Sequence, residues 1–224
     1  MKRRIKFGMI AAVAAVLLAL LPTAVSAQMF GRGSAPSWRG VWNPVVGAGG
    51  TYEITKKDGT KTQMEMAIVG KETVNGKDGY WFEITMSDPK MGGTMIIKNL
   101  TVRDDQNMVS QKVIMQMPNM PPMEMPDRMI QARQQDKQPA DIRQLAEEVG
   151  PESVTTPAGT FSTTHYRMKD GSGDVWVADH AGPYGMVKFQ GKDNSMELIK
   201  VESDAKDKIT GTPQPFSPAA FGQR

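Results

Sequence analysis

The chain has 224 residues and a formal charge of +3, from 27 Lys and Arg against 24 Asp and Glu. Four of the basic residues lie in residues 1–27, which contain no acidic residue, so residues 28–224 carry a formal charge of −1. Nucleic acids and anionic membranes attract clusters of excess Lys and Arg, so partners of these two kinds are excluded. The chain has no cysteine, which excludes disulfides, thiol catalysis and a lipid anchor on an N-terminal Cys.

Residues 1–27 have the three parts of a secretory signal peptide. A basic N-terminus is followed by 13 apolar residues, 9–21, and then by the small side chains of Val25, Ser26 and Ala27. Spanning a bilayer takes about 20 apolar residues, so the apolar stretch is too short for a membrane anchor. We therefore expect cleavage after Ala27, a periplasmic or extracellular location, and no transmembrane segment in the mature chain.

Residues 28–50 are rich in Gly and Pro and contain Trp38 and Trp42, which predicts an irregular lead-in that packs through its aromatic side chains. From residue 51 onward, polar and apolar side chains alternate with the period of a strand that buries one face. Asp-Gly and Asn-Gly pairs between the alternating segments are typical of hairpin turns. The strands predicted from this pattern are 51–55, 62–68, 80–86, 94–102 and 108–117.

A helical insert is predicted over about residues 126–150. The first helix begins at Pro126 and runs toward Gln134. The second follows Pro139, and its apolar side chains are spaced i, i+3, i+4 and i+7 until Gly150 and Pro151 end it. Those apolar side chains are Ile142, Leu145, Ala146 and Val149.

The chain then returns to strand patterns and ends in a segment without a period. The strands predicted here are 153–156, 161–168, 174–178, 185–189 and 196–201. Residues 204–224 are predicted to be a disordered tail, because Pro and Gly interrupt them and apolar side chains are few. We expect a single, mainly β domain over 51–203, a curved antiparallel sheet or half-barrel with one or two helices against its concave face.

Methionine is the unusual feature of the composition. Residues 28–224 contain 16 methionines, and six of them lie in the 15 residues from Met115 to Met129. Methionine is flexible and polarisable, so it lines adaptable apolar surfaces. The residues predicted to bind an apolar ligand are Met117, Met120, Met123, Met125 and Met129.

A second interpretation of the same window is a soft-metal site. Met117, Met120 and Met123 follow one another at a spacing of three, which resembles the methionine motifs of periplasmic copper-handling proteins. Thioether sulfur favours Cu(I), and export would bring the segment to a compartment where copper is handled. Methionines on the strands, such as Met64 and Met86, have a core-facing place in the alternation, which favours simple apolar packing.

The sequence offers no recognisable catalytic or cofactor motif. It lacks a Gly-x-Ser-x-Gly elbow, a phosphate-binding glycine loop and a His-Glu-x-x-His helix. The two histidines, His165 and His180, have no third partner at the spacing of a zinc site. We therefore expect a protein that is not an enzyme and that needs no cofactor.

The last third of the domain resembles a known group of proteins. Its pattern is Val154-Thr-Thr-Pro157-Ala-Gly159-Thr-Phe161, then Val175-Trp176-Val177, then Gly185-Met-Val187-Lys188-Phe189, then Met196-Glu-Leu198. Over residues 151–201 this resembles uncharacterised exported bacterial β-rich proteins, similar in fold to the half-barrels of lipoprotein-localisation carriers. The resemblance implies a concave apolar surface able to hold an acyl chain or the hydrophobic segment of a partner.

The leading expectation is a non-enzymatic periplasmic binding protein for a lipid, another apolar small molecule or a hydrophobic protein segment. One alternative is a Cu(I) or Ag(I) binding protein that uses Met117, Met120 and Met123. Another is a structural protein of envelope assembly that offers an exposed sheet edge to a partner.

Overall fold

The computed structural model describes residues 40–88, 92–105, 107–134, 138–139 and 141–217. Nearly all of them belong to one compact unit, Ser37–Phe216. The predicted signal peptide, Trp38 and the end of the predicted tail lie outside the described residues. In the described part of the chain no helix is both long and apolar enough to cross a bilayer.

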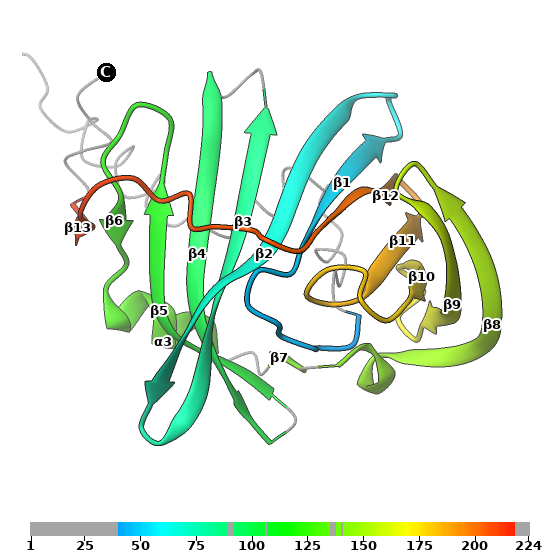
Figure 1. The fold of residues 1–224 in the computed structure, drawn as a ribbon, viewed down its shortest axis with the longest axis horizontal. Coiled ribbons are helices and arrows are strands. Elements are labelled where there is room, and N and C mark those ends of the chain that lie inside the picture. The colour runs from blue at the N-terminus through cyan, green and yellow to red at the C-terminus, as the bar shows by residue number, and fades with distance from the viewer. Residues whose placement is uncertain (1–39, 89–91, 106, 135–137, 140, 218–224) are drawn as a thin grey trace, which may run out of the picture. The chain divides into compact units, whose positions relative to one another are not determined.

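Strands make up most of the described chain (Figure 1). One α-helix and one short 3-10 helix interrupt them in the described residues. The helices are α3 (Asp127–Gln134) and η2 (Ile142–Gln144). The strands are β1 (Gly49–Lys56), β2 (Lys61–Val74), β3 (Lys77–Asp88), β4 (Gly93–Asp104), β5 (Asn107–Gln116), β6 (Met123–Glu124), β7 (Gln138–Pro139), β8 (Ala146–Thr156), β9 (Gly159–Met168), β10 (Gly173–Val177), β11 (Met186–Gly191), β12 (Asn194–Glu202) and β13 (Gln214–Pro215).

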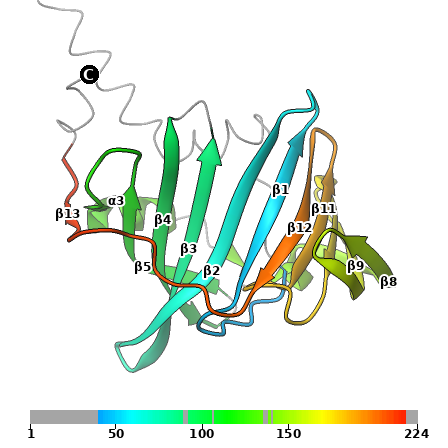
Figure 2. The ribbon, with the colours of Figure 1, turned by 45° about the horizontal axis from the view of Figure 1, so that its top comes forward.

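All the described strands belong to one open sheet in the order β13-β6-β5-β4-β3-β2-β1-β12-β11-β10-β9-β8, and β7 pairs with β5. Each pair is antiparallel except β13 with β6. The sheet consists of two meanders, β1–β6 and β8–β12, which join where β1 pairs with β12 (Figure 2). The prediction of a mainly β fold built on a curved antiparallel sheet is confirmed.

Alternation along each strand separates two faces of this sheet. On β2, Met64 and Met66 are buried on one face, which we call the inner face, and Glu65 lies between them on the outer face. The lead-in packs at one end of the inner face, where Trp42 forms a cluster with Ile68 and Tyr184. The predicted packing of the lead-in through aromatic side chains is confirmed for Trp42.

The prediction of two helices is half right. Helix α3 forms where the first helix was predicted, and it packs against β5. The second prediction is wrong, because Ile142–Gln144 is a single 3-10 turn and β8 begins at Ala146. β8 is hydrogen-bonded along the whole of β9, so tertiary strand pairing overrides the local helical spacing. Val149, which the predicted helix would bury, is 52% exposed in the strand.

The prediction of a disordered tail from Asp204 is wrong for the residues that the structure describes. Residues 203–216, which we call the C-terminal strap, cross the outer face of the sheet from β12 to β6 (Figures 1 and 2). Backbone hydrogen bonds hold both ends of the strap: Ala205 N–H donates to Gly47 O at 2.9 Å and Gln214 N–H to Pro122 O at 2.9 Å. The strap lacks a period because its partners are side chains of the sheet.

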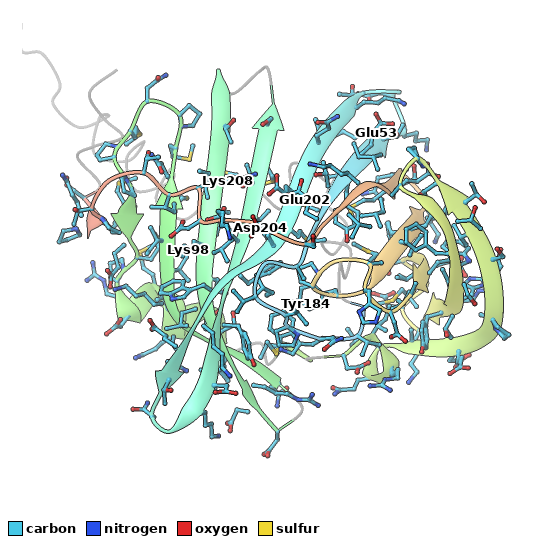
Figure 3. All side chains as sticks on the ribbon, in the orientation of Figure 1. Glu53, Lys98, Tyr184, Glu202, Asp204 and Lys208 are labelled. Atoms are coloured by element: carbon cyan, nitrogen blue, oxygen red, sulfur yellow. The ribbon has the colours of Figure 1, made fainter. Side chains whose placement is uncertain are left out.

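Charged side chains hold the middle of the strap, where it crosses β3 and β4 (Figure 3). The Lys208 ammonium pairs with Glu65, and Asp207 pairs with Lys98. Beneath them Glu83 is 2% exposed, and both of its carboxylate oxygens accept from the Lys208 N–H at 3.3 Å. Burial raises the pKa of Glu83 to about 7, and the neighbouring Asp207 adds to the rise, against Lys98 and the Lys208 N–H.

Deleting residues 204–224 is expected to destabilise the protein, because it removes these ion pairs and the hydrogen bonds of the strap. With a net contribution of about 1 kcal/mol for each hydrogen bond, the melting temperature should fall by about 5 °C or more. Circular dichroism during heating measures it. A control chain that ends at Ser217 keeps every described strap contact and should melt like the full chain. Equal melting of the two chains would contradict a docked strap.

Glu83 should make stability depend on pH. Its pKa of about 7 lies above the ordinary 4.5, so its contribution is complete below about pH 4.5 and is lost as the pH rises through about 7. Between these values the free energy of unfolding should fall by up to about 1.4 kcal/mol per pH unit. Urea unfolding at several pH values measures this slope. Glu83→Gln stays neutral and should flatten the slope; an unchanged slope would contradict this assignment.

Candidate functional site

Methionines from neighbouring strands lie opposite one another on the inner face of the sheet. Met64 of β2 pairs with Met86 of β3, and Met86 pairs with Met95 of β4. Tyr52 of β1 pairs with Met64, so it continues this row at the other side. Met64 and Met95 are fully buried, and Met86 is 5% exposed. Three adjacent strands therefore present thioethers in one row.

A second row lies two residues away from the first on β2, β3 and β4, and it continues onto β5 and β6. Its members are paired in register from β2 to β6, and each of them is a methionine or an isoleucine. In order across the sheet they are Met66, Ile84, Ile97, Met115 and Met123. Cross-strand neighbours on one face have Cβ atoms about 5 Å apart, so the two rows make one continuous apolar surface.

We call this surface the methionine face: Met64, Met86 and Met95 in the first row, and Met66, Ile84, Ile97, Met115 and Met123 in the second. All eight side chains are uncharged. Methionine has three rotatable side-chain bonds and a polarisable sulfur, so a surface with this lining can change its shape while each side chain stays in a favourable rotamer. The sequence assigns the strand methionines to the core, and the structure confirms their burial.

The methionines predicted as ligand-binding residues lie at the β5–β6 side of the methionine face. Met123 belongs to the face itself and is 3% exposed. Met125 follows it, is 8% exposed, and its N–H donates to Val113 O at 2.9 Å. Met129 is half-buried in α3, which packs against β5.

Met117 and Met120 form the turn that leaves β5. The Met120 N–H donates to Met117 O at 3.1 Å, and Asn119 between them has a left-handed φ of 59°. Both methionines are half-buried, whereas Met123 is held in a strand two residues after the turn ends. The soft-metal interpretation assumes one flexible loop, but the structure puts its three sulfur ligands on two different local structures. In the described residues no group of three or more His, Cys, Asp or Glu could hold a metal ion.

Two buried polar atoms lie on the same inner face, and sequence reasoning missed both. Thr62 is 5% exposed and follows the alternation of Met64, and its Oγ1 has no hydrogen-bond partner among the described residues. Asn99 stands two residues beyond Ile97. Its Nδ2 donates to Ser110 Oγ at 2.7 Å, while its Oδ1 is buried and has no partner there. An unpartnered buried polar atom is rare in a folded protein and calls for a physical explanation.

His165 of β9 lies in a polar cluster at the β8–β10 side of the sheet, away from the methionine face. His165 Nε2 lies 2.8 Å from Asp174 Oδ1, and its Nδ1 lies 3.4 Å from Glu152 Oε2. The ring stacks on Trp176 with centroids 4.5 Å apart, and Trp176 Nε1–H donates to Glu152 at 2.7 Å. Both ring nitrogens face carboxylates, so this cluster links β8, β9 and β10 and leaves no free nitrogen for a metal. Finding it from sequence requires the register of three strands.

Comparison with known proteins gives a partial likeness of fold. No family model and no curated protein matches the sequence. A Bacteroides fragilis protein named as a candidate exported protein with a YmcC-like fold is 15% identical, with a TM-score of 0.40, over 73% of this chain and 99% of its own. A candidate lipoprotein of Parabacteroides distasonis is 13% identical, with a TM-score of 0.36, over 73% and 98%. The match to the MucA/MucB complex of Pseudomonas aeruginosa is 10% identical, with a TM-score of 0.39, and it covers 74% of this chain and 56% of the matched chain.

These values describe shared architecture alone. The predicted resemblance to exported bacterial β-rich proteins is confirmed as a weak and partial similarity of fold. The chain spans about half of the MucB-type chain that it matches.

Proposed function

We propose that this chain is an exported, non-enzymatic binding protein that holds an apolar ligand on its methionine face. The observation that supports the proposal is the continuous, uncharged surface made by the two rows from β2 to β6. Ligand sites for small molecules are lined mainly by apolar side chains with a few polar groups among them. The inner face has this composition: the methionine face is apolar, and Thr62 and Asn99 are polar groups at its margins.

The β5–β6 side is the place where a ligand would reach this surface. Met123 continues the second row to the last of its strands, and the half-buried Met117, Met120 and Met129 lie next to it in the chain. These partly exposed thioethers extend the apolar surface from the buried rows toward solvent. Of the five methionines predicted as the ligand site, Met117, Met120 and Met129 would form the entrance, and Met125 would lie buried beside them. The rows, which include Met123, would form the floor.

The location follows from the N-terminus. A basic segment, a short apolar stretch and a small-residue cleavage site direct the chain out of the cytoplasm, so the ligand is one that the periplasm or the cell exterior offers. Lipids, acyl chains and hydrophobic protein segments are apolar molecules of that kind.

Replacing the entrance methionines by serine should weaken the binding of a neutral apolar probe. Met117→Ser with Met120→Ser removes two thioether side chains from the apolar surface, and we expect an affinity for N-phenyl-1-naphthylamine about tenfold lower or worse. Fluorescence titration of the exported protein measures this. Unchanged affinity would exclude the β5–β6 entrance.

The matched control keeps the apolar surface and removes the sulfur. Met117→Leu with Met120→Leu should bind the probe as the original chain does, because leucine preserves the apolar area. The same pair tests the copper alternative. If Cu(I) forms a one-to-one adduct in native mass spectrometry and the leucine pair abolishes it, sulfur ligation is the function of this turn.

A further inference from the structure

The C-terminal strap is attached to the outer face of the sheet at separate points along its length (Figure 3). At one end the Ala205 N–H bonds to Gly47 O, and at the other end the Gln214 N–H bonds to Pro122 O. Between these ends, the N–H groups that bond to the sheet donate to its side chains, not to the backbone of a neighbouring strand. A segment held in this way can detach without unfolding the strands beneath it.

Glu83 lies under the middle of the strap, and its burial is not compensated by a paired cation. The charged groups around it are Glu65 of β2, Lys98 of β4, and Asp207 and Lys208 of the strap. The ammonium group of Lys98 pairs with Asp207, and that of Lys208 pairs with Glu65. Glu83 itself accepts from the neutral backbone N–H of Lys208, at 3.3 Å. Burial under these conditions favours the protonated acid over the carboxylate.

Asp207 is the strap residue that responds to the protonation of Glu83. The two carboxyl groups are hydrogen-bond partners, which requires a proton between them. Burial opposes the ionisation of Asp207, but the hydrogen bonds from Lys98, from the Ile209 N–H and from Glu83 hold the pKa of Asp207 below its usual value. Burial raises the pKa of Glu83 to about 7. The proton therefore belongs to Glu83, which donates it to the Asp207 carboxylate in a hydrogen bond.

Loss of this proton to solvent turns an attractive contact into a repulsive one. Two carboxylates then face each other, and like charges this close disfavour the contact. Detachment of the strap ends the repulsion and returns Glu83 to water, where its pKa is near the ordinary 4.5. Since the pKa is about 7 when the strap is docked, docking is strongest below about pH 4.5 and weakens as the pH rises through 7. Between these values the docking equilibrium should fall by up to about tenfold for each pH unit.

Detachment would uncover an apolar strip of the outer face. Ile96 and Ile114 stand on this face and are only 8% and 5% exposed. Ile96 pairs with Gln116 and Ile114 pairs with Lys98, and both of these polar partners bond to the strap. The strap thus crosses the sheet beside the two isoleucines, and its position decides whether they are buried or open to solvent.

We propose that the C-terminal strap is a proton-dependent latch, closed on the outer face while Glu83 donates its proton to Asp207 and open when Glu83 is ionised. The latch goes beyond the proposed function, because it lies on the opposite face from the methionine face and needs no ligand. It converts a rise in pH into exposure of Ile96 and Ile114 while the sheet stays folded.

Amide hydrogen exchange, measured by NMR on the exported protein at pH 5.5 and pH 8, tests the latch. The reporters are the amides of Ala205, Gln214 and Phe216, which join the strap to the body of the protein. Protection factors, which already correct for the intrinsic effect of pH on exchange, should fall together at these amides by about tenfold or more. At both pH values they should lie below those of the β2–β3 ladder, because the strap opens while the sheet stays folded. Equal protection of strap and ladder would overturn the latch.

Glu83→Gln tests the proton. Glutamine stays neutral and can donate to Asp207 at every pH, so the strap amides of this variant should have the same protection factors at pH 8 as at pH 5.5. A fall as large as that of the original chain would overturn the assignment to Glu83.

Asp207→Asn tests the strap side of the contact, and it remains informative if Glu83→Gln does not fold. The asparagine amide can donate to an ionised Glu83, so the fall in protection between the two pH values should shrink to about threefold or less. The matched control is Asp204→Asn, the same substitution in the same strap at a carboxylate that pairs with Lys206, and it should leave the fall unchanged. Equal falls in the two variants would overturn the role of the carboxyl pair.

Discussion

The pairing of β1 with β12 is the interaction on which the rest of this structure depends. β1 lies between β2 and β12 and joins two meanders that are far apart in sequence into one sheet. Tyr52 secures the joint: its buried hydroxyl lies 3.1 Å from Met186 O and 3.3 Å from Ala181 O, so it donates into the connection before β11. Burial raises the pKa of this phenol, which keeps it protonated and able to donate. One sheet with one uninterrupted inner face results.

The same strands serve two different surfaces because side chains alternate. Along β2, Met64 and Met66 face inward, and Glu65 between them binds the strap from outside. The strap crosses the outer face and provides polar partners for Glu83 and Lys98 there. These two side chains therefore lie on the opposite face from the methionines. Separation of charge from the methionine face is therefore a property of the whole β2–β4 region.

Strand positions and the mainly β class were predictable because alternation is a local signal. The helix predicted over Ile142–Val149 does not form, because most of this segment belongs to β8 and pairs with β9 instead. The spacing of apolar side chains in a short segment carries no information about such a distant strand partner. The strap was missed because its partners, such as Glu83, lie more than a hundred residues away and leave no period. The methionine window was visible in the sequence, but its connection to Met64 and Met95 depends on register across five strands.

Methionine burial alone would be equally compatible with an ordinary core. Two features separate the inner face from one. Six of the eight side chains of the methionine face are methionine, which adapts its shape more readily than leucine or isoleucine and specifies a fixed core less well. It also keeps the Thr62 hydroxyl and one end of the Asn99 amide without partners, at a loss of stability that valine and leucine would avoid. Both features suit a surface that exchanges its own contacts for those of an apolar ligand, as the proposed function requires.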